Sequence, residues 1–160
     1  MKIKMLQDED FVNYKKPSMF IGLGHCNWKC CVESGISSDV CQNSELARQP
    51  DIEVSCQELY ERYAQNPITS AIVIGGLEPF THSSDVIHFI DYVREQGNED
   101  DIVIYTGFYP NEIPYIGTYF KEHYKNIIIK YGRFIPNKPK RFDNVLGIEL
   151  ISNNQYAVRL

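Results

Sequence analysis

Four short apolar segments, spaced along the chain, most strongly limit the folds that this sequence can adopt. They occupy residues 18–24, 70–75, 102–106 and 127–130. Uninterrupted apolar runs of this length are typical of strands that are covered on both faces. Such strands belong to parallel sheets, in which crossover helices cover the two sides.

Helical segments alternate with these strands. Ser55, with Glu58 three residues later, has the pattern of a capping box, and the helix that it starts should end before Asn66, which precedes a proline. Residues 84–96 carry apolar side chains at helical spacing, and a weaker helix is predicted around residues 115–124. The alternation predicts an α/β fold with a mostly parallel sheet, arranged as an open or incomplete TIM-like βα barrel.

The length of the chain limits how far that barrel can close. A complete barrel of eight βα units needs at least about 200 residues, and this chain has 160. No internal repeat and no linker-like segment divides it. We therefore expect residues 1–160 to form a single domain with an incomplete barrel.

Composition and charge exclude several classes of protein. The hydrophobic fraction of 43% argues against disorder. The formal charge of -5 gives no basic footprint, so we expect no nucleic-acid partner. The N-terminal residues lack the apolar core of a signal peptide, and no apolar stretch reaches the roughly 18 residues of a membrane span. We accordingly expect a cytoplasmic protein without a membrane partner.

Residues with chemical potential follow three of the predicted strands. Cysteines occur at residues 26–41 after the first strand, Gly75, Gly76 and Glu78 follow the second, and Thr106 ends the third. Because ligands bind at the carboxyl ends of parallel strands, we expect these loops to form one site.

The cysteines indicate a metal centre. There are five, namely Cys26, Cys30, Cys31, Cys41 and Cys56. Clustered cysteines in a cytosolic protein bind metal or carry out redox chemistry more often than they form structural disulfides. Thiolates favour iron–sulfur clusters, zinc or copper(I), and their spacing alone does not decide between zinc and iron.

The neighbouring cysteines favour a site with three ligands. Zinc-binding pairs are usually separated by two to four residues, whereas Cys30 and Cys31 are adjacent. Adjacent side chains diverge in extended backbone, so we expect only one of this pair to bind. Three thiolates leave one iron of a [4Fe–4S] cluster open to a substrate or cofactor.

The segment Gly24-His-Cys26-Asn-Trp-Lys-Cys30 resembles the cluster loop of radical S-adenosylmethionine enzymes. The usual pattern of that family is C-x3-C-x2-C, but position 33 here is Glu33, and the aromatic Trp28 lies between the first two cysteines. The resemblance then makes Cys41 the displaced third ligand, with Cys31 as the competing candidate. Cys56 falls within a predicted helix, where a buried small side chain is the simpler interpretation.

Further segments resemble the activating proteins of anaerobic ribonucleotide reductase. They are Gly75-Gly-Leu-Glu78-Pro79, Asp10-Phe-Val-Asn13, Tyr105-Thr106-Gly107-Phe108, Gly132-Arg-Phe134 and Ser152-Asn-Asn154-Gln155. Two residues depart from the pattern of those activases: Tyr131 replaces the usual Asp, and Ile151 replaces the usual Gly.

The resemblance implies a radical enzyme that acts on a large protein. Cys26, Cys30 and Cys41 would hold the [4Fe–4S] cluster, and no catalytic residue beyond these ligands is implied. Residues of the glycine–glutamate loop would contact the methionine end of S-adenosylmethionine, namely Gly75, Gly76 and Glu78. Thr106 would line the adenosyl-binding region.

The implied reaction cleaves S-adenosylmethionine to a 5'-deoxyadenosyl radical, which generates a glycyl radical on a partner, most directly anaerobic ribonucleotide reductase. A low-potential donor such as flavodoxin would supply the electron. Two alternatives remain open at this point. One is a radical S-adenosylmethionine enzyme that modifies another protein or peptide, and the other is a non-catalytic α/β module that binds zinc through four thiolates.

Overall fold

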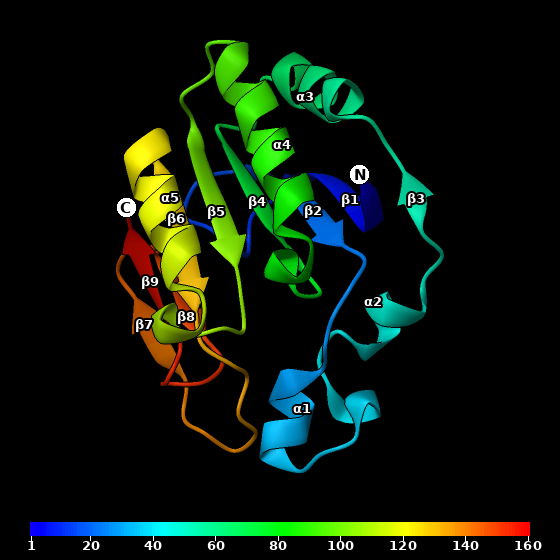
Figure 1. The fold of residues 1–160 in the computed structure, drawn as a ribbon, viewed down its shortest axis with the longest axis vertical. Coiled ribbons are helices and arrows are strands. Elements are labelled where there is room, and N and C mark those ends of the chain that lie inside the picture. The colour runs from blue at the N-terminus through cyan, green and yellow to red at the C-terminus, as the bar shows by residue number, and fades with distance from the viewer.

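A seven-stranded sheet forms the centre of the computed structural model, which describes residues 1–160 (Figure 1). Its strand order is β3-β1-β2-β4-β5-β6-β9. The strands of this sheet are β1 (Lys2–Asp10), β2 (Ser18–Leu23), β3 (Ile52–Glu53), β4 (Ala71–Gly76), β5 (Asp101–Tyr105), β6 (Ile127–Tyr131) and β9 (Tyr156–Arg159). A separate hairpin pairs β7 (Arg141–Asp143) with β8 (Ile148–Leu150).

The four central strands run parallel, as predicted. Strand β2 pairs with β4, β4 with β5, and β5 with β6. Antiparallel strands flank them, with β1 beside β2 and β9 beside β6. The two outermost strands, β3 and β9, do not pair with each other, so the sheet stays open. The predicted α/β fold with a partial, unclosed barrel is confirmed.

Helices connect the parallel strands; α3, α4 and α5 match the predicted ones, whereas α1 and α2 were not predicted. They are α1 (Lys29–Ser34), α2 (Ser44–Arg48), α3 (Cys56–Gln65), α4 (Ser83–Glu95) and α5 (Pro114–His123), with short 3-10 turns at Ser38–Val40, Pro79–His82 and Pro110–Glu112. The side chain of Ser55 accepts a hydrogen bond from the Glu58 amide at 3.0 Å, so the predicted N-cap of α3 is confirmed. Helices α3, α4 and α5 lie on one face of the sheet, whereas α1 lies beyond the strand ends (Figure 1).

Two apolar cores lie on the two faces of the sheet. Alternate residues of each strand point to the helical face, where Ile21, Ile74 and Ile104 are fully buried against α4. On the opposite face, Phe20 and Val103 pack in a smaller core under the β7–β8 hairpin. This double coverage explains why the central strands are uninterrupted apolar runs.

The antiparallel strands β1, β3 and β9 were not predicted. Strand β1 has the sequence KIKMLQDED, and its residues alternate between more and less exposed positions, with Ile3 and Asp10 buried. Its polar composition hides the strand in the sequence, because an edge or half-covered strand needs only every second residue to be apolar. Strand β9 is similarly short and only partly buried.

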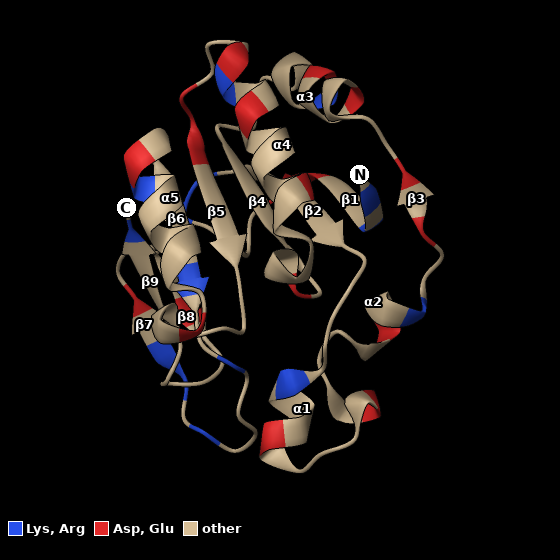
Figure 2. Cartoon of the chain, viewed as in Figure 1, with Lys and Arg blue, Asp and Glu red and all other residues tan.

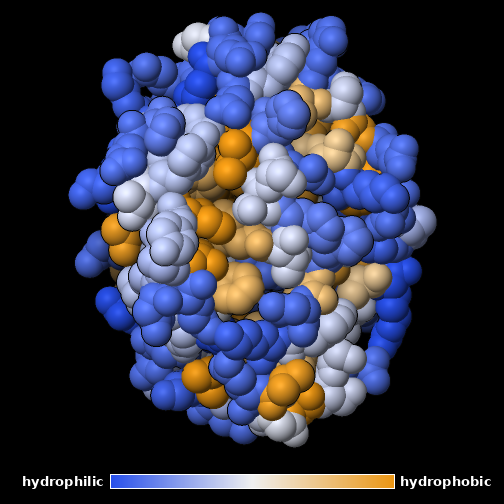
Figure 3. All heavy atoms as spheres, in the orientation of Figure 1, coloured by the Kyte–Doolittle hydropathy of each residue, from blue (hydrophilic) through white to orange (hydrophobic).

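The outer surface is mixed in charge. Acidic and basic residues are spread over the outer elements, and basic residues gather in the loop between β6 and β7 (Figure 2). Polar atoms cover most of the helical face, and apolar atoms gather near its middle (Figure 3). None of the helices combines the length and the apolar character that crossing a membrane requires.

Candidate functional site

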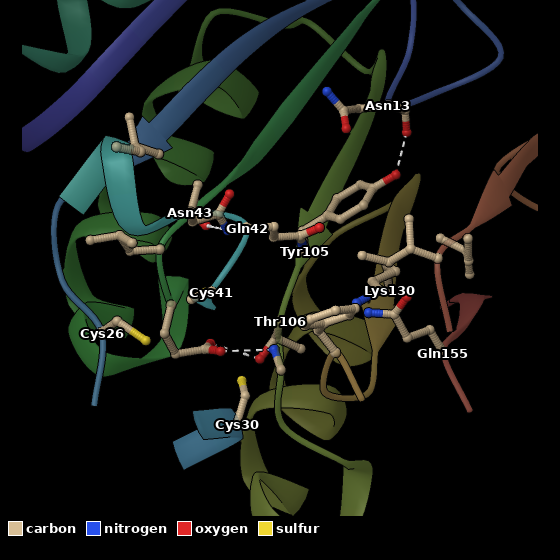
Figure 4. A pocket seen from close by; sticks show the side chains of 18 of the residues that line it. Asn13, Cys26, Cys30, Cys41, Gln42, Asn43, Tyr105, Thr106, Lys130 and Gln155 are labelled. Carbon is tan, nitrogen blue, oxygen red and sulfur yellow. Dashed lines mark hydrogen bonds between the residues drawn. The ribbon is translucent and has the colours of Figure 1, made fainter. Parts of the chain in front are cut away.

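The three strand-end loops surround one cavity of about 530 Å³ (Figure 4). Cys26, Cys30 and Cys41 line it from the loop after β2. Glu78 and Thr106 line it from the ends of β4 and β5. A volume of this size lies within the range of about 300–1,000 Å³ that is typical of small-molecule sites.

The first two cysteines are positioned by a tight backbone turn. Trp28, between them, has a φ of 55°, in the left-handed region that non-glycine residues rarely adopt. Its amide donates to the Cys26 sulfur at 3.3 Å, and helix α1 starts at the next residue. Cys30 therefore lies in the first turn of α1, close to Gly107, where an added Cβ would be 3.3 Å from the Cys30 sulfur.

Cys31 and Cys41 lie next to each other. Helix α1 corrects one step of the sequence argument, since Cys30 and Cys31 lie in helical and not extended backbone. Their side chains still diverge, because successive residues of a helix are rotated by about 100°. Cys31 is buried and lines the same cavity as Cys41, which follows the 3-10 turn Ser38–Val40. Cys56 does not line the cavity.

Burial raises the pKa of three thiols at the cavity, those of Cys26, Cys30 and Cys31. Desolvation raises the pKa of Cys26 to about 11, against a smaller lowering by the Trp28 amide, and nearby Cys30 and Cys41 raise it further. Burial also raises the pKa of Cys30 and of Cys31. Binding of a metal at these sulfurs must therefore release protons and overcome this penalty, since the thiolate is the ligand.

The thiols fit a multi-iron cluster better than a single ion. No group of three or more His, Cys, Asp or Glu side chains converges closely enough to hold one metal ion. A zinc site needs four donors at about 2.0–2.3 Å from one point. Four cysteine side chains line the wall of one cavity, and cysteine thiolates are the usual ligands of iron–sulfur clusters.

Glu78 ties the ends of two strands together. Its side chain is 7% exposed. Oε1 accepts from the Thr106 hydroxyl at 2.7 Å and the Phe80 amide at 3.1 Å, and Oε2 accepts from the Gly107 amide at 2.8 Å. Burial nevertheless raises the pKa of this carboxyl. One acceptor position on Oε2 stays open toward a ligand.

The two glycines before Glu78 are required by packing. Gly76 has a φ of 80°, and an added Cβ would lie 2.8 Å from the Gly22 Cα. Its carbonyl accepts a hydrogen bond from the Asn43 side chain at 2.5 Å, which links the loop after Cys41 to β4. Gly76 lines the cavity, whereas Gly75 is enclosed by Phe20 and Tyr105.

The other segments singled out in the sequence also meet at the cavity. An added Cβ on Gly132, whose φ is 96°, would lie 2.9 Å from the Asn154 carbonyl. Asn154 donates to the Arg133 carbonyl at 2.8 Å. At the N-terminal side, the Tyr105 hydroxyl donates to the Asn13 carbonyl at 2.5 Å. Residues far apart in the chain thus form one continuous wall.

Lys130 is the cavity residue that sequence reasoning missed. It is 6% exposed at the end of β6, and its ammonium donates to the Gly132 carbonyl at 2.9 Å. Burial lowers its pKa to about 8, while the nearby Cys30 and Glu78 side chains act in the opposite direction. The available signal was a lysine at the carboxyl end of an otherwise apolar strand.

A cluster of ion pairs connects α1 with the loops after β5 and β6. Arg133, which is 4% exposed, pairs with Glu112 at 2.5 Å and with Glu33 of α1 at 2.8 Å. Lys29 of α1 pairs with the same Glu112. The Arg133 and Lys29 pairs hold the pKa of Glu112 down to about 2.

The comparisons with known proteins agree with this geometry. A family described as "4Fe-4S single cluster domain" matches residues 19–148, which include the cysteine loop, Glu78 and Lys130. No curated protein and no solved structure matches the chain. The family match is consistent with an iron–sulfur protein of the radical S-adenosylmethionine type. Because the match covers most of its length, the chain belongs to the 4Fe-4S single cluster domain family.

Proposed function

We propose that this protein is a radical S-adenosylmethionine enzyme that generates a glycyl radical on a partner enzyme. One observation carries the proposal: the thiols of Cys26, Cys30 and Cys41 and the Glu78–Thr106 pair line the same cavity at the carboxyl ends of the parallel strands. An iron–sulfur cluster by itself needs only the thiols. The polar Glu78–Thr106 pair beside them offers a second binding region, which S-adenosylmethionine would occupy.

The proposed ligands are Cys26, Cys30 and Cys41. Each is half-buried and lines the cavity, so its sulfur is reachable from the space in which a cluster would lie. Cys31 also lines the cavity, but it is only 4% exposed, which favours a supporting role. The Trp28 amide that reaches the Cys26 sulfur is the kind of donor that holds a ligating thiolate in place.

The remaining cavity residues would bind and orient S-adenosylmethionine. The open acceptor position on Glu78 Oε2 suits the ammonium of the methionine moiety, next to the Gly76 backbone. Thr106 shares that wall of the cavity and would lie toward the adenosyl group. Apolar side chains on the far wall, including Phe134 and Leu150, would exclude water from the reactive carbon.

When bound, a [4Fe–4S] cluster supplies the single electron that cleaves the sulfonium to methionine and a 5'-deoxyadenosyl radical. The protein's own contribution is to bind the ligand and to shield the cavity. For the partner, we propose anaerobic ribonucleotide reductase, with a low-potential donor such as flavodoxin. The open barrel supports a macromolecular substrate, because a loop of another protein needs an unobstructed approach.

A related candidate is an enzyme of the same superfamily that modifies another protein or peptide. Tyr131 and Ile151 favour it, since they replace the Asp and Gly expected in the reductase activases. Tyr131 is buried in the helical core, so it has a packing role at that position.

An anaerobic preparation tests the proposal. The protein should take up iron and sulfide, show a visible absorption that dithionite bleaches, and release 5'-deoxyadenosine from S-adenosylmethionine. Mixing with the reductase should then give a glycyl radical signal in electron paramagnetic resonance. A colourless protein that binds one zinc and releases no 5'-deoxyadenosine would contradict the proposal. Release without a reductase signal would favour another protein substrate.

A further inference from the structure

Lys130 carries a buried charge without a salt-bridge partner within the chain. Its side chain lies inside the cavity at the end of β6 and is 6% exposed (Figure 4). Its one hydrogen-bond partner is the carbonyl of Gly132, at 2.9 Å. The Tyr105 ring lies below the ammonium, 5.8 Å from its centroid. A buried ammonium that is not paired with a carboxylate is costly, so a ligand of opposite charge is expected beside it.

Gln155 holds the same corner of the cavity. It is 2% exposed, and its amide nitrogen donates to the Gly132 carbonyl at 3.3 Å. Its Oε1 atom is buried without a hydrogen-bond partner. Lys130 and Gln155 therefore converge on one carbonyl from two strands, β6 and the start of β9, and this fixes the ammonium in the cavity wall.

The charge of Lys130 acts on the side of the cavity where the thiols lie. Cys30 and Glu78 line the same cavity as Lys130. Cys30 is a proposed cluster ligand. The Glu78 carboxylate already accepts three hydrogen bonds from protein donors, which leaves one acceptor position free. A [4Fe–4S] cluster with three thiolates carries a net negative charge, which increases by one on reduction. A fixed cation nearby stabilises the reduced form more than the oxidised form.

We propose that Lys130 is the counter-charge of the cluster site: its ammonium, fixed by Gly132 and Gln155, raises the reduction potential of the bound cluster. The inference rests on the proposed ligands but not on any reaction with S-adenosylmethionine. It assigns Lys130 a positioning and electrostatic role without contact to the reacting atoms.

The test is a redox titration of the reconstituted protein, followed by electron paramagnetic resonance without S-adenosylmethionine. Lys130→Met removes the positive charge and keeps a side chain of similar volume. Gln155→Glu keeps the ammonium but places a negative charge beside it, which offsets its effect. Both should lower the ratio of reduced to oxidised cluster at a fixed ambient potential by about tenfold, equivalent to about 59 mV for one electron. Lys130→Arg should restore the wild-type potential.

A matched control is Lys125→Met, since Lys125 is exposed and pairs only with Glu99. It should leave the potential unchanged. Wild-type potentials in both Lys130→Met and Gln155→Glu would overturn the proposal. So would an unchanged potential combined with weaker binding of S-adenosylmethionine, because the ammonium would then serve that ligand. If Lys130→Met does not fold, Gln155→Glu alone decides.

The outcome is separable from the proposed function. A wild-type protein that holds a reducible cluster but releases no 5'-deoxyadenosine would contradict the radical chemistry and leave the potential measurement valid. A wild-type protein that takes up no iron would overturn both.

Discussion

The hydroxyl of Thr106 donates a hydrogen bond to Oε1 of Glu78 at 2.7 Å, with both residues almost fully buried. This contact joins the end of β5 to the loop after β4. The same hydroxyl accepts from the Phe108 amide at 3.0 Å, so one side chain links two strand-end loops. Threonine at this position is therefore explained by the protein itself, independently of any ligand.

Thr106→Val should destabilise the protein. The substitution keeps the shape, but Glu78 Oε1 then retains only the Phe80 amide as a donor and the Phe108 amide loses its acceptor, which costs about 1–3 kcal/mol in the free energy of unfolding. Chemical denaturation measures this loss. Thr106→Ser should recover most of it, and Thr118→Val on the exposed face of α5 is the surface control. An unchanged free energy in Thr106→Val would contradict the role assigned to the contact.

Gly107→Ala should reduce cluster uptake. Its added methyl would lie 3.3 Å from the Cys30 sulfur and 3.4 Å from Glu78 Oε2. It would therefore either displace the Cys30 thiol or lower the free energy of unfolding by about 1–3 kcal/mol through overpacking. We expect severalfold less iron per chain after anaerobic reconstitution. Gly117→Ala in α5 is the control, where alanine should stabilise the helix by about 0.5–1 kcal/mol. Wild-type iron in Gly107→Ala would show that Cys30 moves away from Gly107 on binding.

Cys41→Ala should remove the cluster, whereas Cys31→Ala should retain it. Cys26, Cys30, Cys31 and Cys41 all line the cavity, but Cys31 is buried whereas Cys41 is half-buried. Iron and sulfide content with the visible spectrum measures the difference. Cys56→Ala is the control, because Cys56 lies at the start of α3, away from the cavity. The reverse pattern, with iron lost only in Cys31→Ala, would exchange the two roles.

The central fold was predictable because its signals are local. The runs that became β2, β4, β5 and β6 are apolar since both faces of the sheet are covered. The Ser55 cap of α3 was readable for the same reason, as it needs only Glu58 three residues later. Strand β1 was missed because many of its residues are polar, as a strand with one exposed face allows. A short stretch of such sequence looks the same as a loop.

The candidate site was predictable only in part, because its residues meet through the tertiary fold. The loops with Cys26, Glu78 and Thr106 could be grouped, since the carboxyl ends of parallel strands lie together. Lys130 could not be placed, because a terminal lysine of an apolar strand usually reaches solvent. Its burial follows from Gly132 and Gln155, which the sequence separates by more than twenty residues.

The ion pairs around Glu112 should make stability depend on pH in acid. Hydrogen bonds and charge from Arg133, followed by the bond from Lys29, lower the pKa of Glu112 from 4.5 to about 2. A carboxyl whose pKa is lower in the folded state contributes stability above pH 4.5, and this contribution disappears as the pH falls toward 2. Glu112→Gln should therefore cost about 1–2 kcal/mol at pH 7, allowing for solvent screening, and almost nothing near pH 2. Denaturation of both proteins across this range measures the difference, with Glu122→Gln on exposed α5 as the control. If the difference in free energy of unfolding between wild type and Glu112→Gln stays constant from pH 7 to pH 2, the charge of the carboxylate does not stabilise the contact with α1.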